Sequence, residues 1–213
     1  MKLRVFAMEF NPFSENTYII ADEKGTAAII DPGCLYDDEQ QQVLSIIQKH
    51  HLQLERVLLT HCHIDHVMGC KFIYEQLGIL PEHHEIEKSM LANANVQGQF
   101  FGIDCPSPPA AKSYLVPNTI LWVGQIELQI FHTPGHSPGS ISFFHAPSKT
   151  LFSGDVLFQG SIGRTDLPGG NYETLMQSIY QVLLPLGEDV TVYSGHGPKT
   201  TIGREKKCNP FLQ

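Results

Sequence analysis

The chain has 213 residues, and 42% of them are hydrophobic, which is enough for one compact domain with a sizeable core. Asp and Glu outnumber Lys and Arg by 22 to 14, so the formal net charge is −8. The densest basic stretch, residues 204–207, has an acid inside it. Because a chain of this charge repels polyanions, nucleic acid is not an expected partner.

The N-terminal residues lack the long apolar run of a signal peptide, and no stretch approaches the length of a membrane span. Five cysteines, an odd number without paired spacing, indicate reduced thiols. The sequence therefore predicts a cytoplasmic protein without a membrane partner, folded as a single domain over residues 1–213. It leaves the oligomeric state open.

The first part of the chain alternates strand and helix patterns. Short segments rich in β-branched and aromatic residues predict strands at residues 3–10, 16–21, 27–30 and 56–60. Before the last of these strands, acids at residues 37–39 favour the start of a helix. Val43, Ile46 and Ile47 recur at helical spacing, so this helix is expected to bury one face.

A second helix is predicted after His66 and ends at Gly78. The positions that recur at helical spacing in it are Val67, Cys70, Tyr74 and Leu77. Residues 82–101 also show a helical pattern. The neighbouring histidines His83 and His84 are interpreted as surface residues.

Strand patterns return in the second part of the chain. The predicted strands are residues 119–123, 126–132, 141–145, 150–153 and 190–193. A glycine-rich loop covers residues 160–170, and Asn171 is placed to cap a last helix that ends at Pro185. The buried face of that helix is expected to be Leu175, Ile179, Val182 and Leu183. This order of elements fits two sheets with helices on their outer faces.

Three histidines and an aspartate lie within six residues, directly after the predicted strand 56–60. His61 and His63 are two apart in extended chain, so they point to the same side and can share one metal ion. Asp65 and His66 follow as the chain turns into a helix and can address a second ion. Histidines also cluster on surfaces by chance, but four such residues at a strand end argue against it. Imidazole and carboxylate ligands suit zinc, iron or manganese.

Three further residues stand in similar places. His136, Asp155 and His196 each come just after an apolar strand and have glycine beside them. Glycine permits the tight turns through which short side chains from different strands reach a shared point. The sequence therefore predicts that these residues take part in the same kind of site.

In combination, these motifs resemble the metallo-β-lactamase superfamily. The motifs are His61-x-His63-x-Asp65-His66, Thr133-Pro134-Gly135-His136, Ser153-Gly154-Asp155 and Gly195-His196-Gly197. Residues 161–170 and 200–211 are in addition similar to the short, bacterial glyoxalase II-like hydrolases. The resemblance implies an α+β fold, an αββα four-layer sandwich in which two mixed β-sheets are flanked by helices.

The resemblance also implies a ligand set for two divalent metal ions. His61, His63 and His136 would bind the first ion. Asp65, His66 and His196 would bind the second, and Asp155 would bridge the two. Zinc is the first choice of metal, and the same ligands accept iron or manganese.

The implied activity is hydrolysis of a small, anionic thioester such as a hydroxyacyl-glutathione. A zinc-type ion lowers the pKa of bound water to about 7, so a metal-bound hydroxide is available as the nucleophile, and Asp65 can orient it. Arg164 and Arg204 are candidate substrate-binding residues, whereas the neighbouring lysines equally fit solvated surface charge. Longer glyoxalase II enzymes carry a C-terminal helical region that binds glutathione, whereas only 17 residues follow His196 here. The sequence therefore leaves open which thiol forms the thioester substrate.

Two alternative activities compete with this interpretation. Persulfide dioxygenases also resemble the sequence, and they use one iron ion held by residues matching His61, His136 and Asp155, a triad suited to oxygen activation. Nucleases of the superfamily share the first histidine motif but normally carry RNA-binding segments, for which this chain has neither the room nor the charge. A structural zinc site is disfavoured because such sites prefer closed, cysteine-rich shells.

Overall fold

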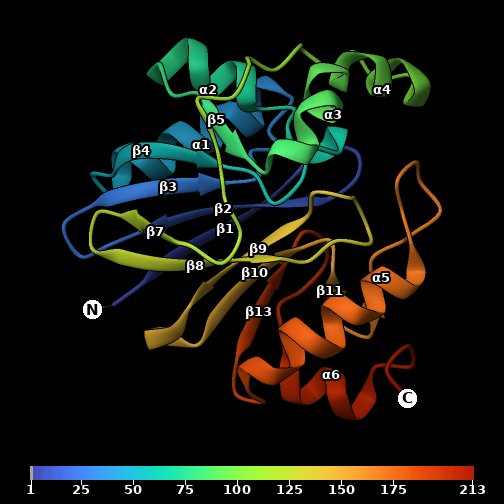
Figure 1. Ribbon diagram of the computed structural model, residues 1–213. Coiled ribbons are helices and arrows are strands. Elements are labelled where there is room, and N and C mark those ends of the chain that lie inside the picture. The colour runs from blue at the N-terminus through green and yellow to red at the C-terminus, as the bar shows by residue number, and fades with distance from the viewer. Residues whose placement is uncertain (1) are drawn as a thin grey trace. The chain divides into compact units, whose positions relative to one another are not determined.

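The computed structural model describes residues 2–213, which fall into two compact units (Figure 1). Unit 1 contains the chain up to residue 115 together with residues 122–126, and unit 2 contains residues 116–121 and 127–213. Each unit has an apolar core of its own. The assignment of residues 1–213 to one domain stays a prediction.

The sheet of unit 1 has six strands in the order β1-β2-β3-β4-β5-β6. Their bounds are Arg4–Phe10, Glu15–Ala21, Thr26–Ile30, Gln53–Leu58, Pro81–His83 and Ser113–Tyr114. The pairs β1–β2 and β2–β3 are antiparallel, whereas β3–β4, β4–β5 and β5–β6 are parallel. The sheet is therefore mixed, and the carboxyl ends of β3 and β4 lie at the same edge.

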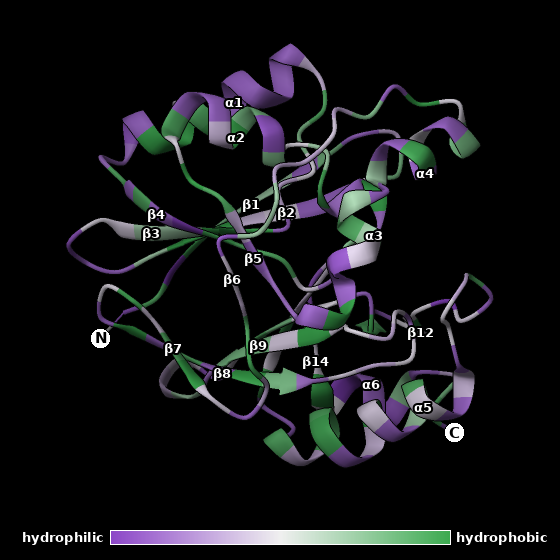
Figure 2. Ribbon diagram, turned by 45° about the horizontal axis from the view of Figure 1, so that its top comes forward, coloured by the Kyte–Doolittle hydropathy of each residue, from purple (hydrophilic) through white to green (hydrophobic). Residues whose placement is uncertain are grey.

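Four α-helices belong to unit 1. They are α1 (Asp37–Lys49), α2 (Cys70–Leu77), α3 (Lys88–Ala92) and α4 (Ala94–Phe101), with 3-10 turns η1 (Ile64–His66) and η2 (Glu85–Glu87) between them. The predicted start of α1 is confirmed, because the carboxylate of Glu39 accepts hydrogen bonds from the backbone N–H groups of Leu35 and Tyr36. In Figure 2 α1 is mostly hydrophilic, as expected of a helix that buries one side.

The buried face of α2 differs from the expected one. Cys70 and Ile73 are buried in the core of unit 1, while Tyr74 and Leu77 are 45% and 39% exposed. The helix has only eight residues, so two core positions on one turn set its orientation, and the next turn is left at the surface. Gly78 ends the helix as predicted.

The prediction of a helix over residues 82–101 is wrong in its first part. Pro81–His83 forms β5, which pairs with Val57 and Leu58 of β4. The side chain of Glu82 accepts two hydrogen bonds from the Arg56 guanidinium of β4, and this long-range pairing overrides the local helical pattern. Asn93 then separates α3 from α4. His83 is buried, not at the surface, and burial lowers its pKa.

The second sheet has six strands in the order β14-β13-β10-β9-β8-β7. In chain order, β7 to β10 are Ile120–Val123, Ile126–His132, Ile141–His145 and Thr150–Gly154, and β13 and β14 are Thr191–Ser194 and Thr200–Thr201. The predicted bounds of β8 and β9 agree with the structure. Strands β10 and β13 pair in parallel, whereas the pairs β8–β9, β9–β10 and β13–β14 are antiparallel, so this sheet is mixed as well.

Helix α5 (Tyr172–Gln177) covers this sheet and begins as predicted, since the side chain of Asn171 accepts a hydrogen bond from the backbone N–H of Thr174. It continues through a π-helical turn, Ser178–Leu183, and a 3-10 turn, Leu184–Leu186. Leu175, Ile179 and Leu183 are fully buried, whereas Val182 is only partly buried.

Three strands and one α-helix of unit 2 were not predicted, among them β14. The short strands β11 (Leu157–Phe158) and β12 (Ser161–Ile162) form a hairpin at the start of the glycine-rich segment. Helix α6 (Ile202–Cys208) follows β14, so α5 is not the last helix. The strands are two residues long, and α6 is only seven residues long, too short for a clear hydrophobic period.

Two mixed sheets and six α-helices are thus present among residues 2–213, which confirms that part of the predicted fold class. All five cysteines are free thiols. Among the helices that the structure describes, none is both long and apolar enough to cross a membrane.

Candidate metal centre

The histidine-rich segment that follows β4 folds into a tight cluster of side chains. We call His61, His63, Asp65 and His66 the unit 1 cluster. All four residues are buried. The ring centroid of His61 lies 4.7 Å from that of His63 and 4.1 Å from that of His66. In addition, His66 Nε2 lies 3.6 Å from Asp65 Oδ2. The loop therefore brings together the three imidazoles and the carboxylate predicted from its spacing.

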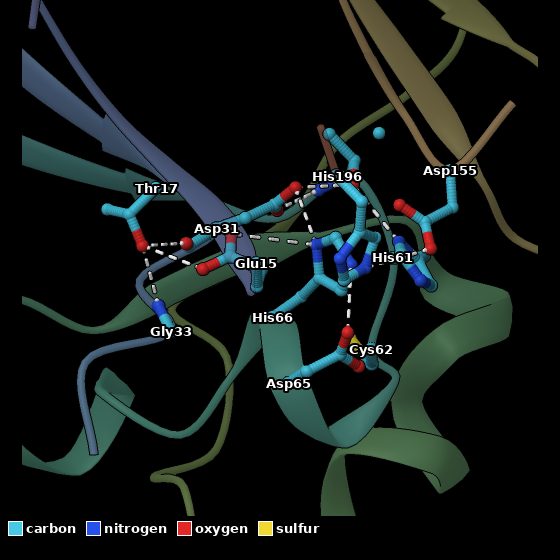
Figure 3. Close-up of polar contacts among 12 residues, drawn as sticks. Glu15, Thr17, Asp31, Gly33, His61, Cys62, Asp65, His66, Asp155 and His196 are labelled. Atoms are coloured by element: carbon cyan, nitrogen blue, oxygen red, sulfur yellow. Dashed lines mark hydrogen bonds and ion pairs between the residues drawn. The ribbon is translucent and has the colours of Figure 1, made fainter. Parts of the chain in front are cut away.

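Asp31, at the end of β3, fixes the orientation of His66 (Figure 3). Its Oδ2 lies 3.0 Å from His66 Nδ1, and Oδ1 accepts a hydrogen bond of 2.7 Å from the backbone N–H of Thr60. Parallel pairing of β3 with β4 places Asp31 beside the start of the cluster. A carboxylate only accepts, so His66 carries its proton on Nδ1 and presents Nε2 as a ligand nitrogen.

The same argument assigns the proton of His61. The Thr60 hydroxyl has one hydrogen, which it donates to Asp31 Oδ2 at 2.6 Å. Its oxygen then accepts from His61 Nδ1 at 3.1 Å. His61 and His66 thus share one supporting carboxylate, and both present Nε2. This arrangement is typical of metal-ligating histidines, whose second nitrogen is held by an outer partner.

Two buried acids that support this cluster were missed by the sequence reasoning. Glu15, at the start of β2, has Oε1 3.9 Å from His66 Nδ1, and burial raises its pKa well above the usual value. Glu87 of η2 accepts a hydrogen bond of 2.9 Å from the backbone N–H of Cys62. Neither acid lies near the histidines in sequence, so no local signal could have found it. The side chain of Cys62, between His61 and His63 in the sequence, packs into the core of unit 1.

The three remaining candidate ligands form a second group, which we call the unit 2 cluster: His136, Asp155 and His196. They follow β8, β10 and β13, and the first two are buried while the side chain of His196 is 27% exposed. Asp155 Oδ2 lies 3.5 Å from His136 Nε2 and 3.4 Å from His196 Nε2. The parallel register of β10 and β13 brings Asp155 and His196 to the same sheet edge.

His136 is oriented by a main-chain group. Its Nδ1 lies 2.8 Å from the carbonyl oxygen of Arg164, which can only accept, so the proton is on Nδ1 and Nε2 faces Asp155. Two glycines permit this close packing. A Cβ on Gly163 would lie 2.0 Å from the carbonyl oxygen of Asp155, and one on Gly135 would lie 2.2 Å from the backbone nitrogen of Leu175.

The candidate substrate-binding residues Arg164 and Arg204 are both exposed. Arg164 is held by Asp166, with Nε and Nη2 each 2.7 Å from a carboxylate oxygen. These hydrogen bonds lower the pKa of Asp166 to about 2. Arg204 lies on α6, and its Nε is 3.9 Å from Glu205. Lys206 and Lys207 both pair with Glu188 at the surface. Substrate contact by either arginine stays a prediction.

The donor set of the two clusters fits divalent transition metals. Nitrogen ligands come from imidazoles with an assigned Nε2 lone pair, and oxygen ligands come from buried carboxylates. Zinc, iron and manganese accept this combination, whereas magnesium and calcium prefer oxygen alone. Each cluster therefore offers donors that suit such a metal ion.

Comparison with known proteins agrees with these features. The sequence profile described as Metallo-beta-lactamase superfamily matches residues 10–196. A protein of Haemophilus influenzae named hydroxyacylglutathione hydrolase GloC is 41% identical over 204 residues, which cover 94% of this chain and 93% of that protein. The crystal structure of the BLEG-1 B3 metallo-beta-lactamase has a TM-score of 0.91 at 37% identity, with 99% and 100% of the two chains covered. TTHA1623, in a di-iron-bound form, has a TM-score of 0.89 at 36% identity, with 98% and 100% covered.

The chain belongs to the metallo-β-lactamase superfamily and has its fold. Within that superfamily it is a metallo-hydrolase, similar to the hydroxyacylglutathione hydrolase GloC.

Proposed function

We propose that the protein hydrolyses small thioesters, with a hydroxyacyl-glutathione as the type of substrate, at a site that holds two divalent metal ions. The observation that carries the proposal is the donor set: His61, His66 and His136 each have Nδ1 engaged by an acceptor and Nε2 presented. The 41% identity to a hydroxyacylglutathione hydrolase supports the substrate class.

In this proposal the two clusters contribute to a common centre. His61, His63 and His136 would hold one ion, and Asp65, His66 and His196 would hold the other. Asp155 would contribute a ligand to both. The di-iron form of TTHA1623 supports a count of two, and zinc is the first choice of metal for this chain.

Bound divalent ions would polarise the thioester carbonyl and lower the pKa of a bound water to about 7. The residues of the chain hold the geometry in which this chemistry works. Asp65 would orient the attacking water, and the 3.6 Å between its Oδ2 and His66 Nε2 supports this role. Asp31 keeps His61 and His66 in the ligand tautomer throughout. Arg164 and Arg204 are proposed to attract the anionic part of the substrate.

The test combines metal analysis with an activity screen. The purified protein is analysed for zinc, iron and manganese, and then assayed for thiol release from S-lactoylglutathione and simpler thioesters. We expect about two ions per chain and metal-dependent thiol release. His61→Ala and Asp155→Ala should lose activity together with bound metal, whereas His50→Ala, whose ring stacks on Phe6 outside both clusters, should keep both.

The same screen includes oxygen uptake with glutathione persulfide. One iron ion per chain, with oxygen uptake and no thiol release, would replace the hydrolase proposal by the dioxygenase alternative. Full activity of His61→Ala at unchanged metal content would overturn the ligand assignment.

A further inference from the structure

Helix α6 carries two buried polar residues that the proposed reaction does not use. Glu205 is 1% exposed and Asn209, just after the helix, is fully buried. Neither group faces solvent, and each makes one hydrogen bond to a segment more than 40 residues away and others to residues nearby in the chain. Such fully satisfied buried networks hold backbone segments in one arrangement.

These two residues hold the turn of the β11–β12 hairpin. Glu205 Oε2 accepts hydrogen bonds of 2.7 Å from the backbone N–H of Gly160 and 2.9 Å from the Asn209 amide. The same amide donates to the carbonyl oxygen of Ser161 at 2.9 Å. Both bonds to the hairpin span more than 40 residues of sequence, so they fix its position against α6.

The hairpin is linked to each member of the unit 2 cluster, either along the chain or by a contact. Strand β11 begins two residues after Asp155, and the hairpin closes with the hydrogen bond from Gly163 N–H to the carbonyl oxygen of Val156. The carbonyl oxygen of Arg164, two residues after the end of β12, accepts a hydrogen bond from His136 Nδ1–H. On the hairpin itself, the ring of Phe158 lies edge-on to His196, with centroids 6.1 Å apart.

Glu205 reaches the His196 loop by a second route. Its Oε1 accepts a hydrogen bond from the hydroxyl of Thr200, the first residue of β14. Strand β14 follows the loop that carries His196 and pairs with Val192 of β13. One carboxylate therefore anchors both ends of the arrangement, the hairpin beside Asp155 and the strand after His196.

We propose that Glu205, with Asn209, is a positioning residue for the metal centre, which sets the geometry of His136, Asp155 and His196 through the β11–β12 hairpin. The proposal rests on the proposed function, because it assumes that these three residues bind metal. It assigns Glu205 no contact with metal or substrate.

The decisive comparison is between Glu205→Leu and Glu205→Gln. Leucine has a similar volume but accepts no hydrogen bond, so the hairpin turn and Thr200 lose their partner. Glutamine can keep its oxygen toward Gly160 and Asn209 while its amide donates to the Thr200 hydroxyl, which is able to accept. We expect the glutamine variant to behave like the parent protein.

The readouts are the zinc affinity, measured by competition with a chelating dye, and the visible spectrum of the cobalt(II)-substituted protein. Glu205→Leu should bind zinc about 10–100-fold more weakly and change the cobalt spectrum, by analogy with the loss of other outer-shell partners. Hydrogen exchange of the hairpin amides should become faster. The control is Glu82→Leu, which removes an equally buried carboxylate of unit 1 and should lower stability without altering zinc affinity.

A Glu205→Leu protein that is less stable but keeps its zinc affinity and cobalt spectrum would overturn the proposal. If that variant does not fold, Asn209→Ala removes the side-chain bonds to Ser161, to Glu205 and to the backbone N–H of Phe211, and the same two readouts decide. A parent protein that binds no metal would instead refute the proposed function. If the parent protein binds metal and the variant keeps the same zinc affinity and cobalt spectrum, only the role of Glu205 is refuted.

Discussion

Asp31 and His66 are joined by a buried contact of 3.0 Å between a carboxylate oxygen and Nδ1. Asp31 has a left-handed backbone, with φ of 49°, an uncommon conformation for a residue other than glycine. Its two oxygens accept hydrogen bonds from Thr60 and His66, and these bonds hold the strained residue in place. The strained residue at the end of β3 is thus the one that orients His66, a candidate metal ligand.

Replacing Asp31 by Asn tests that relationship. The Asn amide would place a donor against His66 Nδ1–H. This favours the tautomer that is protonated on Nε2, in which Nε2 has no lone pair for a metal ion. We expect zinc affinity to fall by about 10–100-fold, measured by competition with a chelating dye. Asn tolerates the left-handed conformation, so the fold should persist. Asp22→Asn, at a buried turn of unit 1, is the matched control, and equal losses in both variants would contradict the prediction.

Gly135, next to His136, should not tolerate a side chain. Its φ is 129°, and an added Cβ would meet the backbone of Leu175 at 2.2 Å. Gly135→Ala is expected to cost about 3 kcal/mol or more of the free energy of unfolding, because the clash is with backbone that cannot rotate away. Urea unfolding measures this. Gly78→Ala, at a helix end with open space around it, should cost only about 1 kcal/mol.

The ion pair between Arg56 and Glu82 should contribute to the stability of unit 1. Glu82 is nearly buried and Arg56 is partly exposed, with 3.1 Å between Nη1 and Oε2. Arg56→Ala leaves a buried carboxylate without its guanidinium partner, although Ser113 still donates to it, so the loss is expected to be about 2 kcal/mol. Urea midpoints of the two proteins check it. A double variant with Glu82→Gln should recover part of the loss.

The cysteines should differ sharply in reactivity. Burial raises the pKa of Cys34 to about 12 and that of Cys105 to about 11, and it raises those of Cys62 and Cys70 as well, whereas Cys208 is exposed. A raised thiol pKa leaves little thiolate, so the fraction present at pH 8 is very small. A maleimide should therefore label the native protein only at Cys208, as read by mass spectrometry. Cys208→Ser should abolish labelling until a denaturant is added.

Metal removal should lower the thermal stability of the protein. A ligand that binds only the folded state stabilises it by about 2.7 kcal/mol at a free concentration 100 times its Kd. Chelation should reduce the melting temperature, and added zinc should restore it. His61→Ala should show neither change. A parent protein whose melting temperature ignores both chelator and zinc would count against a metal centre.

Much of the fold could be predicted where a pattern is local. Strands β8 and β9 have alternating or continuous apolar residues between clear turn formers, and their predicted bounds agree with the structure. The start of α5 follows from Asn171 alone, because a cap depends on residues three positions apart. Pro81–His83 carries no such pattern, and it became a strand because β4 was available to pair with it.

The candidate site divides in the same way. The amino-acid sequence by itself determined which side chains are able to bind metal and that each follows a strand, since His61, His136 and Asp155 stand beside recognisable turns. It also determined the family, through the order of the motifs. Their roles as ligands stay a prediction that the experiments above test.

Only the tertiary structure decided how those side chains are held. Asp31 and His66 are 35 residues apart, and Glu205 and Gly160 are 45 apart, with no period or motif that links them. Hydrogen bonds of this kind depend on strand pairing and on burial, which make an unpartnered polar group costly and so select one arrangement. The tautomers of His61, His66 and His136 follow from those contacts, and the sequence contains no sign of them.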